Sequence, residues 1–494
     1  MREQQAKDKT DIIDFDFEET EIKSLPPNSE DLPQGLVGRP YPYQKIGFSW
    51  LSFMLSECAG CILADEMGLG KTLEVILVFL SLAAKKETPI LVIAPVSLLD
   101  NWKAECAKFA PSLDVVIHHG PNRTGFYKEL LAHDVIVVSY SCACNDLSLL
   151  QMINWSLVVL DEAQNIKNPY SERAKSVRKL PRKTSLVMSG TPFENHILDI
   201  WSLVEFVLPG FLGTMEDFKK TFSDDHNGAI GIEPIITPIM LRRLVKDVAD
   251  DLPDKVVIPQ AITMCDENAA EYEKLRIEAN GNAQNPNAIA LGALTKLRMF
   301  CTYPSLAGSK TIASDPSQSS LKYQRLCELL AEIIANDEKV IVFTSFKKMF
   351  DIFNSDIPNR FGIPVWDING ETPVKERQAI VDRFNHHDGP AMLALNPRAA
   401  GTGLNITGAN HVIHYNLEWN PALEDQASAR AYRHGQKKTV FVYRIYYKNT
   451  VEELVNERLE RKREMASDAI VGSAGTQQEK EDLIRALSLS PINR

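Results

Sequence analysis

The stretch ILADEMGLGKT at residues 62–72 ends in the Gly-Lys-Thr triplet of a phosphate-binding loop. A short apolar run precedes it and a helical pattern follows, so backbone N–H groups and a helix N-terminus could point at a phosphate. Lys71 offers a charge to the terminal phosphates of a nucleotide, and Thr72 offers a hydroxyl to Mg²⁺. The strict pattern G-x-x-x-x-G-K-[ST] requires glycine where Asp65 stands, and this departure weakens the match.

A pair of carboxylates ends another apolar run, VVLDEAQ, at Asp161 and Glu162. Asp161 can hold Mg²⁺ through water, and Glu162 can polarise an attacking water. A lone Asp-Glu pair at a strand end is often only solvated. Because this pair follows a phosphate loop, the catalytic interpretation is favoured.

Two arginines in the stretch DQASARAYRHGQ (425–436) could complete such a site. Arg430 and Arg433 are about one helical turn apart and would share a face. They could reach a γ-phosphate held by the first half of the chain, as arginine fingers do. An ordinary basic helix face is the alternative, but it leaves the Gly-rich turn GTGLN (401–405) just upstream unexplained.

Short apolar runs must position these groups. In the first half they are continuous and rich in Val, Ile and Leu, which is typical of parallel strands buried on both faces. Helical patterns such as KTLEVILVFLSLAAKK separate them, which predicts a doubly wound α/β sheet. The runs are GCILA (60–64), PILVIAP (89–95), LDVVIHH (113–119), DVIVVSY (134–140), WSLVVLDEA (155–163) and TSLVMSG (184–190).

A second series of the same kind fills the last third of the chain. Its runs are KVIVFTS (339–345), VWDING (365–370), AMLALNP (391–397), HVIHYN (411–416) and TVFVYRIYY (439–447). The sequence between the two series is mostly helical, and GSKTIASDPSQSS (308–320) is typical of a linker. We therefore expect two doubly wound parallel-sheet lobes with a helical insertion between them. The expected domains are an acidic N-terminal segment (1–36), a first lobe with the start of the insertion (37–245), the insertion and linker (246–320), a second lobe (321–450), and a brace-like helix with a tail (451–494).

The composition limits the class of protein. The chain has 494 residues, of which 44% are hydrophobic and 24% charged, and this fits several soluble globular domains. We find no apolar run of about 20 residues and no secretory signal, so no membrane contact is expected. The net charge of −11 argues against passive coating of nucleic acid but leaves room for a local basic track. The spacing Cys58-x-x-Cys61 could suggest zinc, but the other pair, Cys142-x-Cys144, does not fit a zinc ribbon, so reduced core cysteines are expected.

Ten short stretches form an ordered set along the chain. They are PYQ (42–44), DEMGLGKT (65–72), LVIAPVSLLDNW (91–102), DEAQNIKN (161–168), SGTPFEN (189–195), MLRR (240–243), LRMFCTYPSL (297–306), VIVFTSF (340–346), AAGTGLNIT (399–407) and DQASARAYRHGQ (425–436). Their order and spacing resemble those of the Swi/Snf-type ATPases of helicase superfamily two, over residues from about 39 to 455. The phosphate loop of that family resembles the one here, so Asp65 agrees with the resemblance, which also implies two RecA-like lobes.

The resemblance implies roles for individual residues. It implies that ATP is bound by Gln44 through the adenine, by the loop residues Asp65, Glu66, Met67, Gly68, Leu69, Gly70, Lys71 and Thr72, and by Gly401 and Gly403 of the second lobe. Thr72 and Asp161 resemble the Mg²⁺ groups. The catalytic set would be Lys71, Asp161, Glu162, Arg430 and Arg433. Ser189, Gly190 and Thr191 resemble the motif that couples hydrolysis to movement of the lobes.

Further residues are expected to face a nucleic-acid backbone. Hydroxyl and main-chain N–H groups can contact phosphates without reading bases. The alternative is packing at strand ends, above all for Trp102 and Phe346. The set is Pro95, Asn101, Trp102, Ser139, Tyr140, Ser345, Phe346 and Thr402.

Other features point to a minimal motor core. Asn416 stands where the family has an acidic residue before the Trp-Asn-Pro turn, which leaves that contact open. The insertion looks short and no chromatin-reading segment is recognisable, so a monomeric core of bacterial or phage type is expected, in the cytoplasm, or in the nucleus of a eukaryote. It could serve transcription, repair or antiphage defence with other subunits. The acidic stretch DIIDFDFEETE (11–21) could be an autoinhibitor on a basic groove or a disordered or edge segment.

The expected activity is ATP-dependent movement along double-stranded DNA, which would remodel protein–DNA complexes without strand separation. A strand-separating helicase is one alternative, but it would need a pin that no segment obviously supplies. A nucleotide-gated DNA-binding switch in a larger complex is another, and it would be expected to lack the carboxylate or arginine pair. A nuclease would need a separate metal cluster, which we do not find in the sequence.

Overall fold

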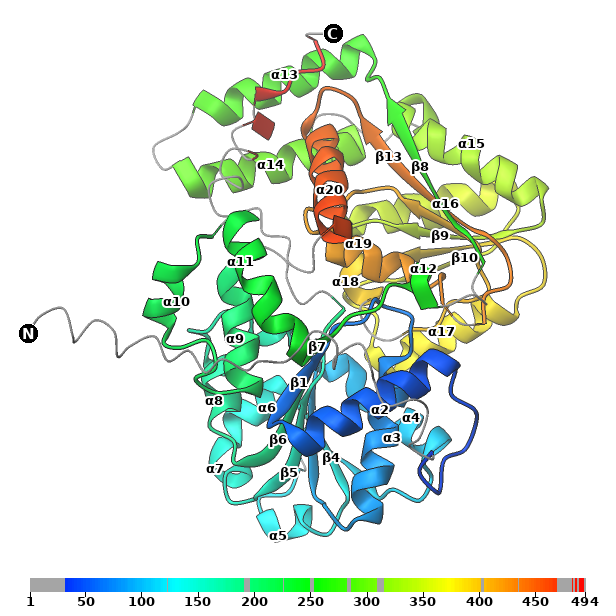
Figure 1. Ribbon diagram of the computed structural model, residues 1–494. Coiled ribbons are helices and arrows are strands. Elements are labelled where there is room, and N and C mark those ends of the chain that lie inside the picture. Colours follow the sequence, from blue (N-terminus) through cyan, green and yellow to red (C-terminus); the bar gives the residue numbers. More distant parts are fainter. Residues whose placement is uncertain are drawn as a thin grey trace, which may run out of the picture.

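The structure consists mainly of two α/β lobes, each built on a parallel sheet, which lie one above the other in Figure 1. The computed structural model describes residues 32–121, 123–190, 196–224, 226–248, 253–281, 286–308, 315–400, 404–433 and 435–468, together with 482, 485, 486 and 488–492. Most of the expected acidic segment 1–36 and much of the tail thus lie outside the described residues. The two-lobed α/β fold expected from the sequence is confirmed. No helix within the described residues is both long and apolar enough to cross a membrane.

The first lobe contains a seven-stranded sheet in the order β3-β4-β2-β5-β6-β1-β7, with every pair of neighbouring strands parallel. Its strands are β1 (Gly60–Leu63), β2 (Ile90–Ala94), β3 (Val115–His118), β4 (Val135–Ser139), β5 (Trp155–Leu160), β6 (Arg182–Met188) and β7 (Met240–Leu241). Helices α2 (Pro42–Glu57), α3 (Lys71–Ala84) and α4 (Leu99–Phe109) cover one face, and α6 (Tyr140–Asn145), α8 (Glu172–Arg178) and α9 (Ile197–Val207) cover the other. The remaining helices are α5 (Tyr127–Leu130), α7 (Leu147–Leu150), α10 (Met215–Thr221), α11 (His226–Ile236) and α12 (Val245–Val248).

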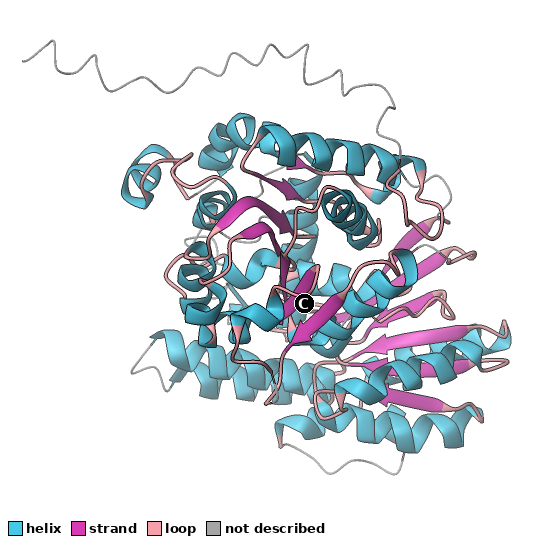
Figure 2. Cartoon of the chain, turned by 90° about the horizontal axis from the view of Figure 1, so that it is seen from below, coloured by secondary structure: helices cyan, strands magenta, loops and turns pink. Residues whose placement is uncertain are grey.

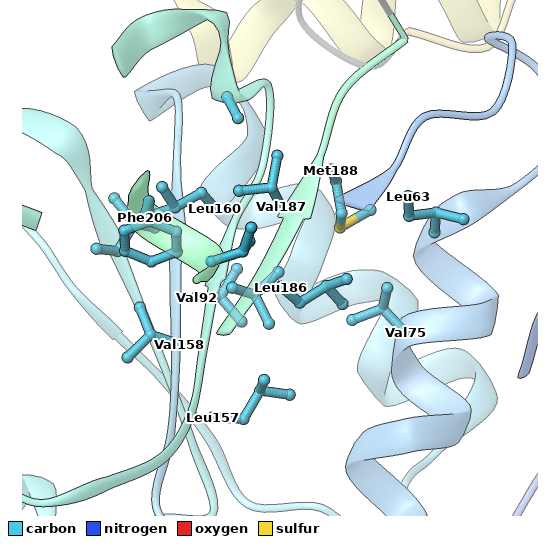
Figure 3. Close-up of a cluster of buried hydrophobic side chains, with 14 of the residues drawn as sticks. Leu63, Val75, Val92, Leu157, Val158, Leu160, Leu186, Val187, Met188 and Phe206 are labelled. Carbon is cyan, nitrogen blue, oxygen red and sulfur yellow. The ribbon is translucent and has the colours of Figure 1, made fainter. Parts of the chain in front are cut away.

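The central strands of the first sheet are buried on both faces, and this burial holds them in place. Every residue of β1, β2 and β4 is buried, as their continuous apolar runs predict. Figure 3 shows side chains of β1, β2, β5 and β6 between Val75 of α3 and Phe206 of α9. Burying one such side chain is worth about 1.5–3 kcal/mol relative to its exposed state. The loops at the carboxyl ends of these strands therefore start from well-anchored positions.

The second lobe contains a six-stranded parallel sheet in the order β10-β11-β9-β12-β13-β8. Its strands are β8 (Lys255–Ile262), β9 (Lys339–Phe343), β10 (Val365–Ile368), β11 (Ala391–Leu395), β12 (His411–His414) and β13 (Val440–Tyr447). Helices α15 (Leu321–Ala335) and α16 (Lys347–Phe361) cover one face, and α17 (Val374–His386), α18 (Pro397–Ala400) and α19 (Pro421–Ser428) cover the other. Helices α13 (Asp266–Gly281), α14 (Pro286–Thr302) and α20 (Val451–Asp468) share a separate core. Seen from below, the strands of both sheets lie between helices (Figure 2).

The stretch 246–320, which we expected to be a helical insertion and linker, also contributes a strand. β8 pairs with β13 along its whole length, from Lys255 to Ile262, and forms the edge of the second sheet. Its β-branched residues favour a strand, and an edge position tolerates Pro259, whose nitrogen cannot donate to a ladder. The proline and the flanking helical patterns concealed this strand in the sequence.

Asn416 has contacts that require an amide at this position. Its Oδ1 accepts a hydrogen bond from Thr344 Oγ1 (2.8 Å), and its Nδ2 donates one to Thr302 Oγ1 (2.6 Å). The Thr302 hydroxyl hydrogen is already donated to the Arg298 carbonyl oxygen (2.7 Å), so Thr302 can only accept from residue 416. A carboxylate could not donate this bond. The buried amide therefore joins the ends of β9 and β12 to α14.

We expect Asn416→Asp to lower the free energy of unfolding by about 1–3 kcal/mol, because it buries a carboxylate and removes the donor to Thr302. Urea denaturation measures the difference. Asn359→Asp, at an exposed position of α16, serves as the control and should change stability by less than about 0.5 kcal/mol. Equal stability of the Asn416→Asp protein and the wild type would contradict this account of the amide.

Candidate active site between the two lobes

The candidate phosphate loop connects β1 to α3. Gly68 and Gly70 have φ angles of +98° and +75°, and Gly70 is the N-cap of α3. A Cβ atom at Gly68 would lie 3.3 Å from the carbonyl oxygen of Tyr432, so glycine permits both the turn and the approach of the second lobe. Lys71 Nζ donates to the carbonyl oxygens of Asp65 (2.7 Å) and Glu66 (3.3 Å). The lysine and the helix N-terminus thus border a loop of the kind that binds phosphate.

Asp65 stands at the glycine position of the strict pattern because its carboxylate has a specific partner. The side chain is fully buried and accepts hydrogen bonds from the backbone N–H of Arg243 (2.9 Å) and from its guanidinium, with Nε at 3.0 Å from Oδ1. Arg243 also donates to both carboxylate oxygens of Glu74 (2.7 and 2.8 Å) and to the Tyr43 carbonyl oxygen. One guanidinium therefore joins the phosphate loop, α3, the start of α2 and the segment after β7.

Helix α2 approaches this ion pair through a glycine. A Cβ atom at Gly47 would overlap Glu74 Oε2 and would lie 2.8 Å from Arg243 Nη2. Burial raises the pKa of Glu74 to about 8, although the positive charge of Arg243 opposes the shift. The pair is therefore enclosed by α2 and α3.

Asp161 and Glu162 follow β5, and the side chain of Asp161 is held from two directions. Its Oδ2 accepts from Trp102 Nε1 (2.8 Å), and its Oδ1 accepts from the backbone N–H of Glu162 (2.9 Å). Burial and the neighbouring Glu162 raise the pKa of Asp161 to about 7, and the indole N–H of Trp102 and the charge of Lys71 oppose the rise. Carboxylate and hydroxyl oxygens suit Mg²⁺. Asp161 and Thr72 are thus the candidate groups to hold this ion.

Three residues expected to face nucleic acid are buried instead. Trp102, Ser139 and Tyr140 are 1%, 1% and 3% exposed, which agrees with the alternative of packing at strand ends, and a nucleic-acid contact of these residues stays a prediction. The Tyr140 hydroxyl donates to the Asp161 carbonyl oxygen (2.9 Å), and Trp102 donates to the Asp161 carboxylate. Ser139 Oγ accepts from the Cys142 N–H (3.2 Å) and caps α6. The two aromatic rings bury large apolar areas in the core and use their single polar atoms to orient Asp161.

The other candidates for backbone contact have accessible surface. Residues 95 and 101 lie after β2, and residues 345 and 346 lie after β9. All four are only partly buried. They are Pro95, Asn101, Ser345 and Phe346. Thr402 lies outside the described residues.

Glu162 contacts both lobes. Its backbone has φ +48°, its Oε2 accepts from Gln164 Nε2 (2.8 Å), and its Oε1 accepts from Gln426 Nε2 (3.3 Å) of the second lobe. Gln164 in turn accepts from Ser189 Oγ (3.4 Å). We did not predict Gln164 or Gln426 as site residues, although both lie inside stretches that carried the family resemblance. Their amides bracket the carboxylate and link it to the candidate coupling residue Ser189.

The two candidate finger arginines, Arg430 and Arg433, belong to the second lobe. They lie in turns after α19, which ends at Ser428, and not on the regular helix that we expected. Burial and the charge of Arg433 lower the pKa of Arg430 to about 10, and Glu162 opposes this shift. The buried Nε of Arg430 has no hydrogen-bond partner among the described residues, and Arg433 Nη1 donates to the Leu404 carbonyl oxygen (3.4 Å). A buried guanidinium with an unused N–H, close to Glu162, is suited to an anionic ligand.

Two further predicted residues, Gln44 and Gly190, border the same loop. The Gln44 amide accepts from the Tyr41 N–H (3.0 Å) and donates to the Leu69 carbonyl oxygen (3.0 Å), so it connects the start of α2 to the phosphate loop. A Cβ atom at Gly190 would lie 2.6 Å from the Met67 side chain, so glycine lets the strand end approach the loop. Three predicted residues, Thr191, Gly401 and Gly403, lie outside the described residues.

We expect Asp65→Gly, which restores the strict loop pattern, to weaken nucleotide binding. The change removes one of the two carboxylates around the buried Arg243, which should cost about 3 kcal/mol of stability and displace the loop. Titration with a fluorescent ATP analogue and urea denaturation test both effects. Asp100→Gly, at an exposed position of α4, is the control. Tighter nucleotide binding by the Asp65→Gly protein would contradict the role given to Asp65.

Comparison with known proteins identifies the family. Residues 43–306 match the SNF2-related domain, and residues 321–435 match the helicase conserved C-terminal domain. The chain is 35% identical over 488 residues to the putative ATP-dependent helicase/translocase YwqA of Bacillus subtilis, covering 94% of this chain and 53% of that protein. It is 32% identical over 487 residues to the Zorya protein ZorD of Escherichia coli, covering 87% and 44%.

A solved structure, the SWI2/SNF2 ATPase core of Sulfolobus solfataricus in complex with dsDNA, is 33% identical, with a TM-score of 0.46 over 93% of this chain and all of that one. The chain spans about half the length of the curated relatives it matches. The SNF2-related domain alone accounts for more than half of the residues, and so the chain belongs to the SNF2 family of ATPases.

Proposed function

We propose that the chain is an ATP-dependent translocase on double-stranded DNA, which binds ATP between its lobes and uses hydrolysis to change their contact. The observation that carries the proposal is the hydrogen bond between Glu162 of the first lobe and Gln426 of the second. Residues 430–433 of the second lobe, which we call the arginine segment, also lie against Gly68 of the phosphate loop. The groups needed for hydrolysis therefore come from both lobes, so opening the lobes would dismantle the site.

The chain's own residues supply the chemistry. Lys71 and the α3 N-terminus would bind the phosphates, and Glu162 would accept a hydrogen bond from the attacking water and orient it. Arg430 and Arg433 would balance the negative charge that develops on the γ-phosphate. Mg²⁺, held by Thr72 and Asp161, would neutralise phosphate charge when bound. Ser189, Gly190 and Thr191 would couple these events to movement, through the contact of Ser189 with Gln164.

Candidate DNA contacts of the two lobes lie at equivalent places in the two sheets. β2 and β9 each occupy the third position in their sheet order, and the partly buried Asn101 and Ser345 follow these strands. Exposed lysines, Lys103 and Lys348, stand on the helices that follow. Two equivalent contact points that move relative to one another suit stepping along a phosphate backbone.

Relatives suggest the setting of this activity. YwqA is named a helicase/translocase, and MOT1 of Saccharomyces cerevisiae, 31% identical over 504 residues, is named a TATA-binding protein-associated factor. We therefore place the chain in the remodelling of protein–DNA complexes, with transcription, repair or antiphage defence as the process served and other subunits as partners. Several of the relatives are bacterial, which suggests a bacterial cytoplasm.

We expect Glu162→Gln to bind ATP with near-normal affinity while turnover falls about 10²–10⁴-fold, because only the group that activates water is lost. A fluorescent ATP analogue measures binding, and phosphate release measures turnover. Glu172→Gln, at an exposed position of α8, is the control and should behave as wild type. Turnover of Glu162→Gln within a few-fold of wild type would contradict the catalytic assignment.

We expect the protein to displace a triplex-forming third strand from duplex DNA in an ATP-dependent manner, with little release of a fully paired strand. Opening a base-pair step costs about 1.4 kcal/mol, so energy does not forbid unwinding by ATP, and the outcome depends on geometry. Arg433→Ala should abolish displacement but keep DNA binding. Efficient unwinding of a blunt duplex would favour a strand-separating helicase. Loss of both activities despite DNA-stimulated hydrolysis would favour a nucleotide-gated switch.

A further inference from the structure

Tyr432 lies between the two candidate finger arginines, and it packs both against the core of its own lobe and against a small cluster of the first lobe. The ring contacts a small apolar cluster formed by Tyr43, Leu69 and Val245, with Val248 beside it. Tyr43 belongs to α2, Leu69 to the phosphate loop, and Val245 and Val248 to α12, which follows the first sheet. In addition, the carbonyl oxygen of Tyr432 faces Gly68. A single residue of the arginine segment thus packs against a surface that is built from the phosphate loop, α2 and α12.

The surface that receives this ring is itself fixed by the phosphate loop. The backbone N–H groups of Ala64 and Glu66 donate to the carbonyl oxygens of Leu241 (2.7 Å) and Arg243 (2.9 Å). The Glu66 carboxylate then accepts from the backbone N–H of Val245 (2.7 Å). Through these bonds the loop and the start of α12 are attached side by side. A movement of the loop would therefore also move the surface against which Tyr432 packs.

The arginine segment is short and held by hydrogen bonds, so a shift of the Tyr432 ring would also shift the neighbouring arginines. The N–H groups of Ala431 and Tyr432 both donate to the Ser428 carbonyl oxygen, at 3.1 Å each, and hold the turn after α19. Arg430 and Arg433 are two residues before and one residue after Tyr432. Lys255 Nζ lies 5.7 Å from the ring centroid, so the edge strand β8 covers the ring from the second lobe. The position of the ring and the positions of both guanidinium groups are therefore linked.

We propose that Tyr432 is a positioning residue, which seats the second lobe on the phosphate loop and α12 and thereby brings Arg430 and Arg433 to their working distance from ATP. The proposal rests on the proposed function, because the arginines are taken to act on the nucleotide. The ring meets the first-lobe cluster when the lobes are closed, and separation of the lobes would expose the cluster and the side of the ring that faces it. Apolar packing of the ring, and not its hydroxyl, is the contribution that matters here.

The test compares Tyr432→Ala, Tyr432→Phe and the matched control Tyr446→Ala. Tyr446 is a partly buried tyrosine of the same lobe that packs with Leu417, Val455 and Leu459. Lobe closure is followed by energy transfer between dyes attached through unnatural amino acids at the exposed positions of Lys179 and Lys448, with a non-hydrolysable ATP analogue. ATP turnover and the KM for ATP are measured in parallel on unlabelled proteins.

We expect Tyr432→Ala to reduce the closed fraction and to lower kcat by about 10²-fold, since a displacement of catalytic groups by about 1 Å can have that effect. The KM for ATP should change less than threefold, because Lys71 and the phosphate loop remain. Tyr432→Phe should restore closure and turnover, and Tyr446→Ala should leave both near wild type. Closure of the Tyr432→Ala protein equal to wild type would overturn the proposal, as would failure of Tyr432→Phe to restore closure. If the wild type closed on the analogue without hydrolysing ATP, the proposed function would fail, and the closure comparison would still decide the role of Tyr432.

Discussion

The nucleotide side of the structure depends on one buried guanidinium. Arg243 lies between the carboxylates of Asp65 and Glu74 and contacts the backbone of Tyr43, so it joins segments far apart in the sequence. Removing one partner from a buried ion pair costs several kcal/mol, because the remaining charge has lost its water. The phosphate loop, α2, α3 and the segment after β7 must therefore keep one relative arrangement. That arrangement provides the surface on which the second lobe docks.

The division of the site between two lobes follows from the two sheets. The phosphate loop and the Asp161–Glu162 pair follow the carboxyl ends of β1 and β5, where parallel α/β sheets commonly bind ligands. The second lobe contributes the candidate site residues Gln426, Tyr432, Arg430 and Arg433, from α19 and the turns after it. Gln426 touches the first lobe by a single long hydrogen bond, and Tyr432 touches it through a small apolar cluster. Contacts of this kind between the described residues can form and break during a cycle, whereas each lobe has an extensive core of its own.

Local sequence patterns explain why most strands, the phosphate loop and the carboxylate pair could be predicted. The apolar runs predicted eleven strands because strands covered on both faces need continuous apolar sequence, and the loop and the carboxylate pair are short contiguous patterns. Contacts across long sequence distances were not predictable. The bond between Asp65 and Arg243 spans 178 residues, and nothing near Asp65 in the sequence names its partner. The hydrogen bonds of Trp102 and Tyr140 to Asp161 were missed for the same reason, because they span 59 and 21 residues. The edge strand β8 was missed because Pro259 argues against a strand unless its edge position is known.

In the proposed function, hydrolysis at the interlobe site is coupled to duplex DNA. The most direct test measures the steady-state rate of ATP hydrolysis with duplex DNA of unrelated sequences, single-stranded DNA and structured RNA over a series of salt concentrations. Backbone contacts predict stimulation by any duplex, weaker stimulation by single strands, and a steep loss of stimulation as salt rises, because counterions released from the phosphates oppose binding. Stimulation by RNA alone, or hydrolysis that is indifferent to every nucleic acid, would contradict the account.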